Sequence, residues 1–212
     1  MRTRIKICGI RHPDDALCAA EAGADAIGLV FYPASPRAVS IEVAVEIQNC
    51  LPPFVDTVAL FVNPTPGLVH DVITQVKPTL LQFHGDESPD FCASFAHPYL
   101  KAVRVKATMR GEDLLQSKAA FGRARALLLD TFNDQLYGGS GERFNWEMIP
   151  GTLRQSIVLS GGLTPDNVAS AVKAIRPWAV DVSSGVEQQK GIKDPAKITA
   201  FIEAVQLADQ GI

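Results

Sequence analysis

Short apolar segments rich in β-branched residues recur along the chain, and turn residues follow each of them. Apolar runs of this length between turn signals are typical of strands that are buried on both faces. The pattern predicts eight strands, at residues 4–8 (RIKIC), 26–31 (AIGLVF), 57–62 (TVALFV), 80–84 (LLQFH), 100–105 (LKAVRV), 126–130 (ALLLD), 156–160 (SIVLS) and 179–184 (AVDVSS).

Helical patterns lie between these segments. Thr65 and Pro66 form a cap followed by proline, and apolar residues from Leu68 to Val76 then recur on one helical face. Other helix starts and one helix end carry comparable capping signals. These are Thr164 with Pro165, Asp194 with Pro195, Ser40 before Ile41, and Gly23 at the end of the first helix.

The alternation of strands and helices predicts the fold. The strands are too apolar to have a solvent-exposed face, which indicates an all-parallel sheet covered by helices. Eight such strands closed into a ring give a (β/α)8 barrel. An open doubly wound sheet is the alternative, but the first strand-to-helix turn, CGIRHP, lacks the G-x-G-x-x-G of a dinucleotide site. No linker or low-complexity segment interrupts the pattern, so we expect one domain over residues 1–212.

Charge and composition narrow the class of partner. The 20 Lys+Arg and 23 Asp+Glu give a net charge of -3, which argues against nucleic acid or an anionic membrane surface as a partner. No apolar run approaches the roughly 18 residues of a membrane span, and the N-terminus has no signal-peptide pattern. The four cysteines form no C-x-x-C and no metal-type pairing with the four histidines. We therefore expect a cytoplasmic protein without a metal site, in which a local site holds any anionic ligand. The sequence leaves the oligomeric state open between a monomer and a homodimer.

The carboxyl ends of the predicted strands carry polar residues, and barrels of this kind build their sites there. Cys8 ends the first strand, and period-two alternation points Lys6 and Cys8 toward the barrel axis. A free cysteine is most often a buried hydrophobe, so a core role is the alternative to a reactive thiol. Lys6 either favours the thiolate of Cys8 or pairs with a carboxylate such as Asp181.

Polar residues or glycines mark several further strand ends. Asp130 ends the sixth strand, and Arg37, in SPR, follows the second; a turn cap and a solvated loop residue are their ordinary interpretations. The segments SGGL and SSGVE are either tight turns or a phosphate site built from backbone N–H groups. His84 ends the fourth strand with an open role, and the glycine-rich segment 137–146 is either a lid or a surface loop.

The chain resembles the phosphoribosylanthranilate isomerases of tryptophan biosynthesis. The matching motifs occur in order over nearly the whole chain: KICG, SPR, QFHG, LLLD, SGGL, and DVSSGVE followed by KD. The resemblance implies a (β/α)8 barrel without a cofactor. It also implies an Amadori rearrangement that converts N-(5-phosphoribosyl)anthranilate to an open-chain 1-deoxyribulose phosphate.

The resemblance implies roles for individual residues. Cys8 corresponds to the general base, Asp130 to the general acid, and Arg37 to the arginine that contacts the anthranilate carboxylate. The other candidates for contact with the phosphorylated substrate lie on the seventh and eighth strand ends. They are Gly161, Gly162, Asp181, Ser183, Ser184 and Gly185.

Other functions remain as alternatives. The histidine-pathway isomerase performs the same chemistry but has a carboxylate where this chain has Cys8. Ribulose-phosphate epimerases use metal-binding His and Asp positions, and indole-glycerol-phosphate synthase uses strand-end Lys and Glu pairs. Neither pattern is found in this sequence. A non-catalytic barrel that binds a phosphorylated ligand would need the glycine-rich loops but neither Cys8 nor Asp130.

Overall fold

A computed structural model describes residues 2–131 and 145–211 of the chain. Its eight principal strands follow the predicted order. They are β1 (Arg4–Cys8), β2 (Ala26–Val30), β3 (Asp56–Phe61), β4 (Leu80–Phe83), β5 (Tyr99–Val105), β6 (Ala126–Thr131), β7 (Ile157–Leu159) and β8 (Ala179–Val182). The α-helices between and after them are α1 (Pro13–Ala22), α2 (Ile41–Cys50), α3 (Pro66–Gln75), α4 (Pro89–Ala93), α5 (Gly111–Ala120), α6 (Pro165–Ile175) and α7 (Pro195–Gln210).

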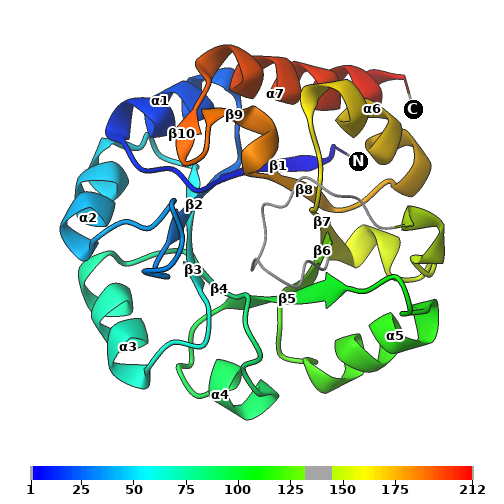
Figure 1. Cartoon of the computed structure of the whole chain (residues 1–212), viewed down its shortest axis with the longest axis horizontal. Coiled ribbons are helices and arrows are strands. Elements are labelled where there is room, and N and C mark those ends of the chain that lie inside the picture. The colour runs from blue at the N-terminus through cyan, green and yellow to red at the C-terminus, as the bar shows by residue number, and fades with distance from the viewer. Residues whose placement is uncertain (1, 132–144, 212) are drawn as a thin grey trace.

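The eight strands close into a parallel barrel, which confirms the predicted (β/α)8 fold. Each strand pairs with the next, and β1 pairs with β8 in a register that sets Lys6 beside Asp181. Figure 1 shows the strands as a central ring with the helices outside it. The alternative, an open doubly wound sheet, is wrong because β1 and β8 are hydrogen-bonded neighbours.

Helix starts and ends follow the predicted signals. The side chains of Ser40, Thr65 and Asp194 each accept a hydrogen bond from the backbone of the first helical turn. Gly23 ends α1 in the left-handed conformation, with φ of 105°. These local caps set where each helix begins and ends, and hence how long each strand-to-helix loop is.

Side chains alternate between two apolar layers. Ile5 and Ile7 lie in the layer between sheet and helices, as do Leu127 and Leu129. A second, smaller cluster fills the barrel interior, and it includes Leu128. Lys6 and Cys8 take the inward positions of β1, because successive side chains of a strand point to opposite faces. The barrel axis is therefore apolar in the middle and polar toward the carboxyl ends of the strands.

A short hairpin follows β8 and was not predicted from the sequence. It consists of β9 (Glu187–Gln189) and β10 (Ile192–Lys193), which pair antiparallel, and a 3-10 turn over Ser184–Val186 precedes it. In Figure 1 the hairpin lies over β1 at one end of the barrel, beside α7. Within the described residues, no helix is both long and apolar enough to cross a membrane.

Candidate active site

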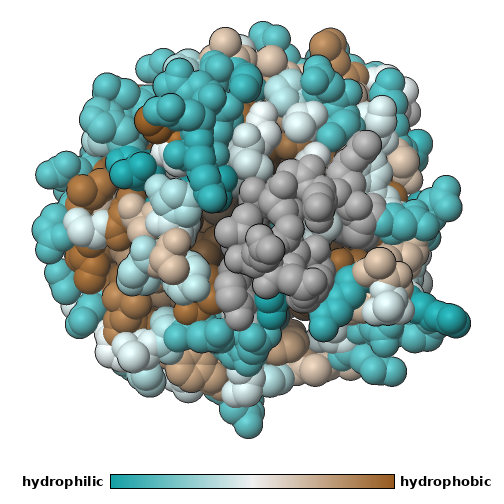
Figure 2. Space-filling view, in the orientation of Figure 1, coloured by the Kyte–Doolittle hydropathy of each residue, from teal (hydrophilic) through white to brown (hydrophobic). Residues whose placement is uncertain are grey.

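The carboxyl ends of the strands surround a hollow of about 470 Å³ that is open to solvent. Figure 2 views the molecule along the barrel axis and shows a hollow near the centre of that face, with hydrophilic residues prevailing around the rim. Val30, Leu60 and Val62 form an apolar wall that packs against Cys8. The polar lining comes from five strand ends and loops, at Ser35, Arg37, His84, Asp130, Ser160, Asp181 and Ser183.

Cys8 lies at the inner end of this hollow and is 5% exposed. Gly28 on the neighbouring strand leaves room for it, because a Cβ at Gly28 would lie 2.7 Å from the Cys8 Sγ. Burial raises the pKa of the Cys8 thiol, the charge of Lys6 lowers it, and the charge of Asp181 raises it further. The net result is a raised pKa, so the thiol form prevails at neutral pH.

Lys6 forms the ion pair with Asp181 that was one of its two predicted roles. Its Nζ lies 2.7 Å from the Asp181 Oδ1, and both side chains are buried. The Ser160 hydroxyl donates to the other oxygen of Asp181 at 3.2 Å. The two expectations for Lys6 are compatible, because the same ammonium group also acts on Cys8 electrostatically.

Asp130 is 4% exposed, and each of its carboxylate oxygens has a hydrogen-bond partner. The Nε2 of His84 lies 3.1 Å from one carboxylate oxygen, and the backbone N–H of Thr131 donates to the other at 2.9 Å. The Nδ1 of His84 lies 2.9 Å from the amide nitrogen of Gln82, one inward position further down β4. Three side chains thus form a hydrogen-bonded row from the barrel interior to the hollow.

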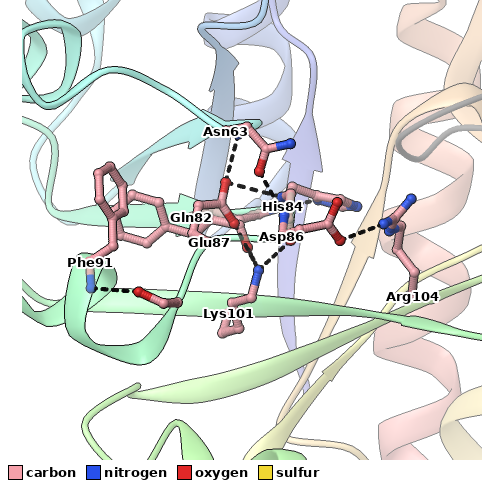
Figure 3. A network of polar contacts seen from close by, with 11 residues as sticks. Asn63, Gln82, His84, Asp86, Glu87, Phe91, Lys101 and Arg104 are labelled. Atoms are coloured by element: carbon pink, nitrogen blue, oxygen red, sulfur yellow. Dashed lines mark hydrogen bonds and ion pairs between the residues drawn. The ribbon is translucent and has the colours of Figure 1, made fainter.

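The loop after β4 is held by a buried ion pair. Lys101 Nζ contacts Glu87 Oε2 at 2.8 Å and also donates to the backbone carbonyl of Gly85 at 2.6 Å. The other oxygen of Glu87 accepts from the backbone N–H groups of Asn63 and Gly85. Figure 3 shows this network directly beside His84. It fixes the backbone that follows β4 and with it the position of the His84 ring.

Arg37 is 8% exposed and bound by the hairpin. Its Nε and Nη2 donate to the two oxygens of Glu187 at 2.6 and 2.9 Å, and Lys193 Nζ lies 3.2 Å from the same carboxylate. Burial alone would raise the pKa of Glu187, but hydrogen bonds and charge from Arg37 and Lys193 lower it. Burial lowers the pKa of Lys193, although Glu187 opposes that effect. Glu187 thus occupies one edge of the guanidinium, and within the described ranges Nη1, on the other edge, has no hydrogen-bond partner.

The SGGL segment forms an open loop between β7 and α6. Gly161 and Gly162 have φ of 85° and 65°, a region that favours glycine. The Asn167 amide donates to the Gly162 carbonyl at 2.9 Å and turns that peptide group. The N–H groups of both glycines donate to no other residue within the described ranges.

The DVSSG segment approaches the same loop from β8. A Cβ at Gly185 would collide with the backbone carbonyl of Leu163, so the two glycine-rich segments lie against each other. Ser184 begins the 3-10 turn. The Ser183 hydroxyl is buried at the hollow and has no hydrogen-bond partner among the residues that the structure describes. Backbone and hydroxyl donors therefore gather at the ends of β7 and β8, as the sequence predicts for an anion site.

The chain is similar to the proteins of one family over nearly its whole length. Residues 5–204 match the family described as N-(5'phosphoribosyl)anthranilate (PRA) isomerase. The chain is 53% identical over 209 residues, 99% of its length and 98% of the relative's, to the N-(5'-phosphoribosyl)anthranilate isomerase of Pseudomonas fluorescens Pf-5. The chain belongs to the phosphoribosylanthranilate isomerase family.

Solved structures of family members share the barrel. The crystal structure of phosphoribosyl anthranilate isomerase from Thermotoga maritima has a TM-score of 0.86 and 42% identity, and the match covers 96% of this chain and 98% of that one. A second similar structure is of a phosphoribosyl anthranilate isomerase in complex with reduced 1-(o-carboxyphenylamino)-1-deoxyribulose 5-phosphate. It has a TM-score of 0.79 and 41% identity, with the same two coverages. Membership of the family extends over the whole barrel.

In this family member, five of the predicted site residues line one hollow: Cys8, Arg37, Asp130, Asp181 and Ser183. The predicted glycines and Ser184 lie on the adjoining loops. Of the segment 137–146, residues 137–144 lie outside the described residues. Within the described ranges, no group of three or more His, Cys, Asp or Glu side chains could hold a metal ion.

Sequence reasoning missed the residues that hold this site together. Gln82, Glu187 and Lys193 are buried, and each contacts a predicted site residue or its partner. The sequence signals were their place and their motifs: Gln82 interrupts an apolar strand in QFHG, and Glu187 and Lys193, in DVSSGVE and KD, flank a glycine. None of these signals names the residue that each contacts.

Proposed function

We propose that the chain catalyses the isomerisation of N-(5'-phosphoribosyl)anthranilate to 1-(2-carboxyphenylamino)-1-deoxyribulose 5-phosphate in tryptophan biosynthesis. Membership of the isomerase family supports the overall reaction. One observation carries the assignment of residues: Cys8 and Asp130, from β1 and β6, line the same hollow together with Arg37. We assign Cys8 as the general base and Asp130 as the general acid.

The reaction needs one proton donor and one proton acceptor. The acid protonates the furanose ring oxygen, and the C1'–O bond breaks to give a Schiff base. The base then removes the proton from C2', and the resulting enolamine tautomerises to the ketone. Only protons move between protein and substrate, so we propose that the activity requires no cofactor.

The surroundings of Cys8 suit a base that takes up a proton reversibly. A thiol with an ordinary pKa of about 8.5 is only a few per cent thiolate at pH 7, and burial reduces that fraction further. The Lys6 ammonium opposes the effect of burial. The Asp181 carboxylate holds Lys6 in place and, in this proposal, keeps its charge beside the thiol.

Two binding contacts complete the proposal. The free edge of Arg37, with Nη1 and Nη2, binds the anthranilate carboxylate, since Glu187 occupies only the other edge. The phosphate binds the N–H groups of Gly161 and Gly162, with the Ser183 hydroxyl and the turn at Ser184 and Gly185 beside them. A family member's complex with a reduced deoxyribulose phosphate supports a ligand of this size and charge.

We further propose that residues 1–212 act as one domain in the cytoplasm. Uninterrupted strand and helix alternation supports the first point, and the absence of disulfides among the four cysteines is consistent with the second.

Turnover of the substrate tests the proposal. Anthranilate and phosphoribosyl pyrophosphate are joined by a separate transferase, and loss of the substrate's fluorescence is followed. We expect turnover by the wild type and a loss of roughly 10² or more in kcat for Cys8→Ser and Asp130→Asn.

Control substitutions of the same type, made outside the hollow, distinguish loss of a catalytic group from a general loss of folding. Cys18→Ser, on a half-buried position of α1, and Asp71→Asn, on the exposed face of α3, should retain wild-type turnover. A wild type that binds product analogue but does not turn over would contradict the proposed activity. A folded Cys8→Ser or Asp130→Asn with wild-type kcat would contradict that residue's assignment.

A further inference from the structure

Gln82 is a fully buried amide in the interior of the barrel, with 0% of its surface exposed. Its neighbours on the inward face of β4 are Leu80, which packs against the apolar interior, and His84. The amide nitrogen lies 2.9 Å from His84 Nδ1, but the amide oxygen has no hydrogen-bond partner within the described residues. Leaving such an oxygen unpaired costs about 1–3 kcal/mol, so an apolar side chain of the same shape would suit packing alone better.

The direction of each hydrogen bond in the row determines the next. The Gln82 amide nitrogen can only donate, so His84 Nδ1 accepts and the ring carries its proton on Nε2. That Nε2–H then donates to Asp130 Oδ2, 3.1 Å away. The row as it stands therefore matches an ionised Asp130, whose second oxygen also accepts from a backbone N–H.

The unpaired oxygen of Gln82 offers the opposite arrangement. Rotation of the amide by half a turn about its last bond would place Oε1 against His84 Nδ1 and give that oxygen its missing partner. Nδ1 would then carry the ring proton and donate to Oε1. Nε2 would present a lone pair to Asp130, which matches a protonated carboxyl group that donates from Oδ2.

We propose that Gln82 is a positioning residue that acts through His84 to set the protonation state of Asp130. In the first state the ring holds its proton on Nε2 and Asp130 is a carboxylate. In the second the ring holds a proton on Nδ1 and Asp130 is a carboxylic acid. The ring is neutral in both, and the second state contains one more proton, taken up from water at the open hollow.

This proposal rests on the proposed function, because it assumes that Asp130 acts as an acid. It supplies what that role requires. The acid must be protonated before the furanose ring opens, and the amide orientation in the structure directs donors at both oxygens of Asp130. The buried ion pair of Glu87 and Lys101 holds the loop after β4 without any contact to Gln82 (Figure 3).

Two substitutions of Gln82 test the inference. Gln82→Met keeps the volume but removes both hydrogen-bonding groups. Gln82→Glu presents an acceptor to Nδ1 and holds the ring proton there. Thr57→Val is the matched control, because it removes a fully buried, unpartnered hydroxyl from the neighbouring strand β3 without touching His84.

Two readouts are measured on each folded variant: kcat and KM, and the ¹⁵N spectrum of the His84 ring. The spectrum distinguishes a ring protonated on Nε2 from one protonated on Nδ1, and His84→Gln assigns the signal among the four histidines. We expect Nε2–H in the ligand-free wild type, Nδ1–H in Gln82→Glu, and a mixture in Gln82→Met. Both variants should lose roughly tenfold or more in kcat, because neither side chain can alternate between donating to and accepting from Nδ1 during the cycle. KM should change little, since substrate contacts are intact. Thr57→Val should match the wild type.

The wild type alone provides the first test. A His84 ring protonated on Nδ1 in the ligand-free wild type would overturn the proposal, and this result does not depend on whether any variant folds. A changed tautomer with unchanged kcat overturns it, as does a fall in kcat with the wild-type tautomer. The proposed function is judged separately by Asp130→Asn. If that variant is inactive while both Gln82 variants turn over normally, the acid assignment stands and the role of Gln82 does not.

Discussion

Cys8 lies near two opposite charges, and its reactivity depends on their balance. The ammonium group of Lys6 lowers the pKa of the thiol, whereas the carboxylate of Asp181 raises it. In Lys6→Met the lowering effect is lost and the charge of Asp181 is no longer compensated. We therefore expect the Cys8 pKa to rise, and alkylation by iodoacetamide at mildly alkaline pH to slow several-fold.

Substitution of Asp181 should shift the Cys8 pKa in the opposite direction. Asp181→Asn removes the charge that raises the Cys8 pKa, so its alkylation profile should move to lower pH. Both profiles are measured as the rate of alkylation of Cys8 against pH, with the modified residue identified by mass spectrometry. An identical thiol titration in Lys6→Met and the wild type would show that Lys6 does not act on Cys8.

At the scale of elements, the β9–β10 hairpin holds Arg37 through a single carboxylate. Glu187 bonds both Arg37 and Lys193, and these contacts lower the pKa of Glu187 below its ordinary value. A group with a lowered folded pKa stabilises the fold above its unfolded pKa, about 4.3, and loses that contribution as the pH falls through the folded value. Glu187→Gln should thus cost about 1–3 kcal/mol near neutrality, and less in acid.

Urea unfolding at a series of pH values measures this difference. The gap between wild type and Glu187→Gln should be constant near neutral pH and should narrow below about pH 4. Glu203→Gln, on the exposed face of α7, provides the control without a buried partner. A gap that does not depend on pH would indicate that the carboxylate charge contributes nothing to the hairpin's stability.

The loop between β7 and α6 depends on a glycine conformation. Gly161 has φ of 85°, and a Cβ there would lie 2.6 Å from the backbone nitrogen of Thr131. Gly161→Ala must displace either the loop or the end of β6, so we expect KM for the phosphorylated substrate to rise roughly tenfold or more. Gly151→Ala is the control, because a Cβ there meets no atom within 4 Å. Equal KM values for the two variants would show that Gly161 does not contribute to binding of the phosphorylated substrate.

The sequence predicted the barrel strands but neither the hairpin nor the contacts between strands. All eight barrel strands were predicted with bounds that agree to within one or two residues, because buried parallel strands are apolar runs that end at turn residues. The β9–β10 hairpin was missed because EQQKGIK has no alternation of apolar and polar residues. The row from Gln82 to Asp130 was missed for a different reason: it joins β4 to β6, and no local pattern specifies which side chains meet across a barrel.

Over the whole molecule, the barrel interior is packed unevenly along its axis. The amino-terminal end of the strands encloses a hollow of about 560 Å³, open to solvent and lined largely by small and apolar residues, among them Ala126. Ala59, in contrast, lies in the fully buried layer between sheet and helices. Ala126→Val should fill empty space on a strand that favours β-branched residues, and we expect it to stabilise the fold by about 0.5–1.5 kcal/mol. Ala59→Val adds the same two carbons where no space exists and should destabilise the fold by about 1–3 kcal/mol.

Thermal unfolding of both variants measures the difference in stability. Turnover should be unchanged in Ala126→Val, because the catalytic hollow lies at the opposite end of the strands. Destabilisation of similar size by both substitutions would mean that the amino-terminal hollow is closed in solution.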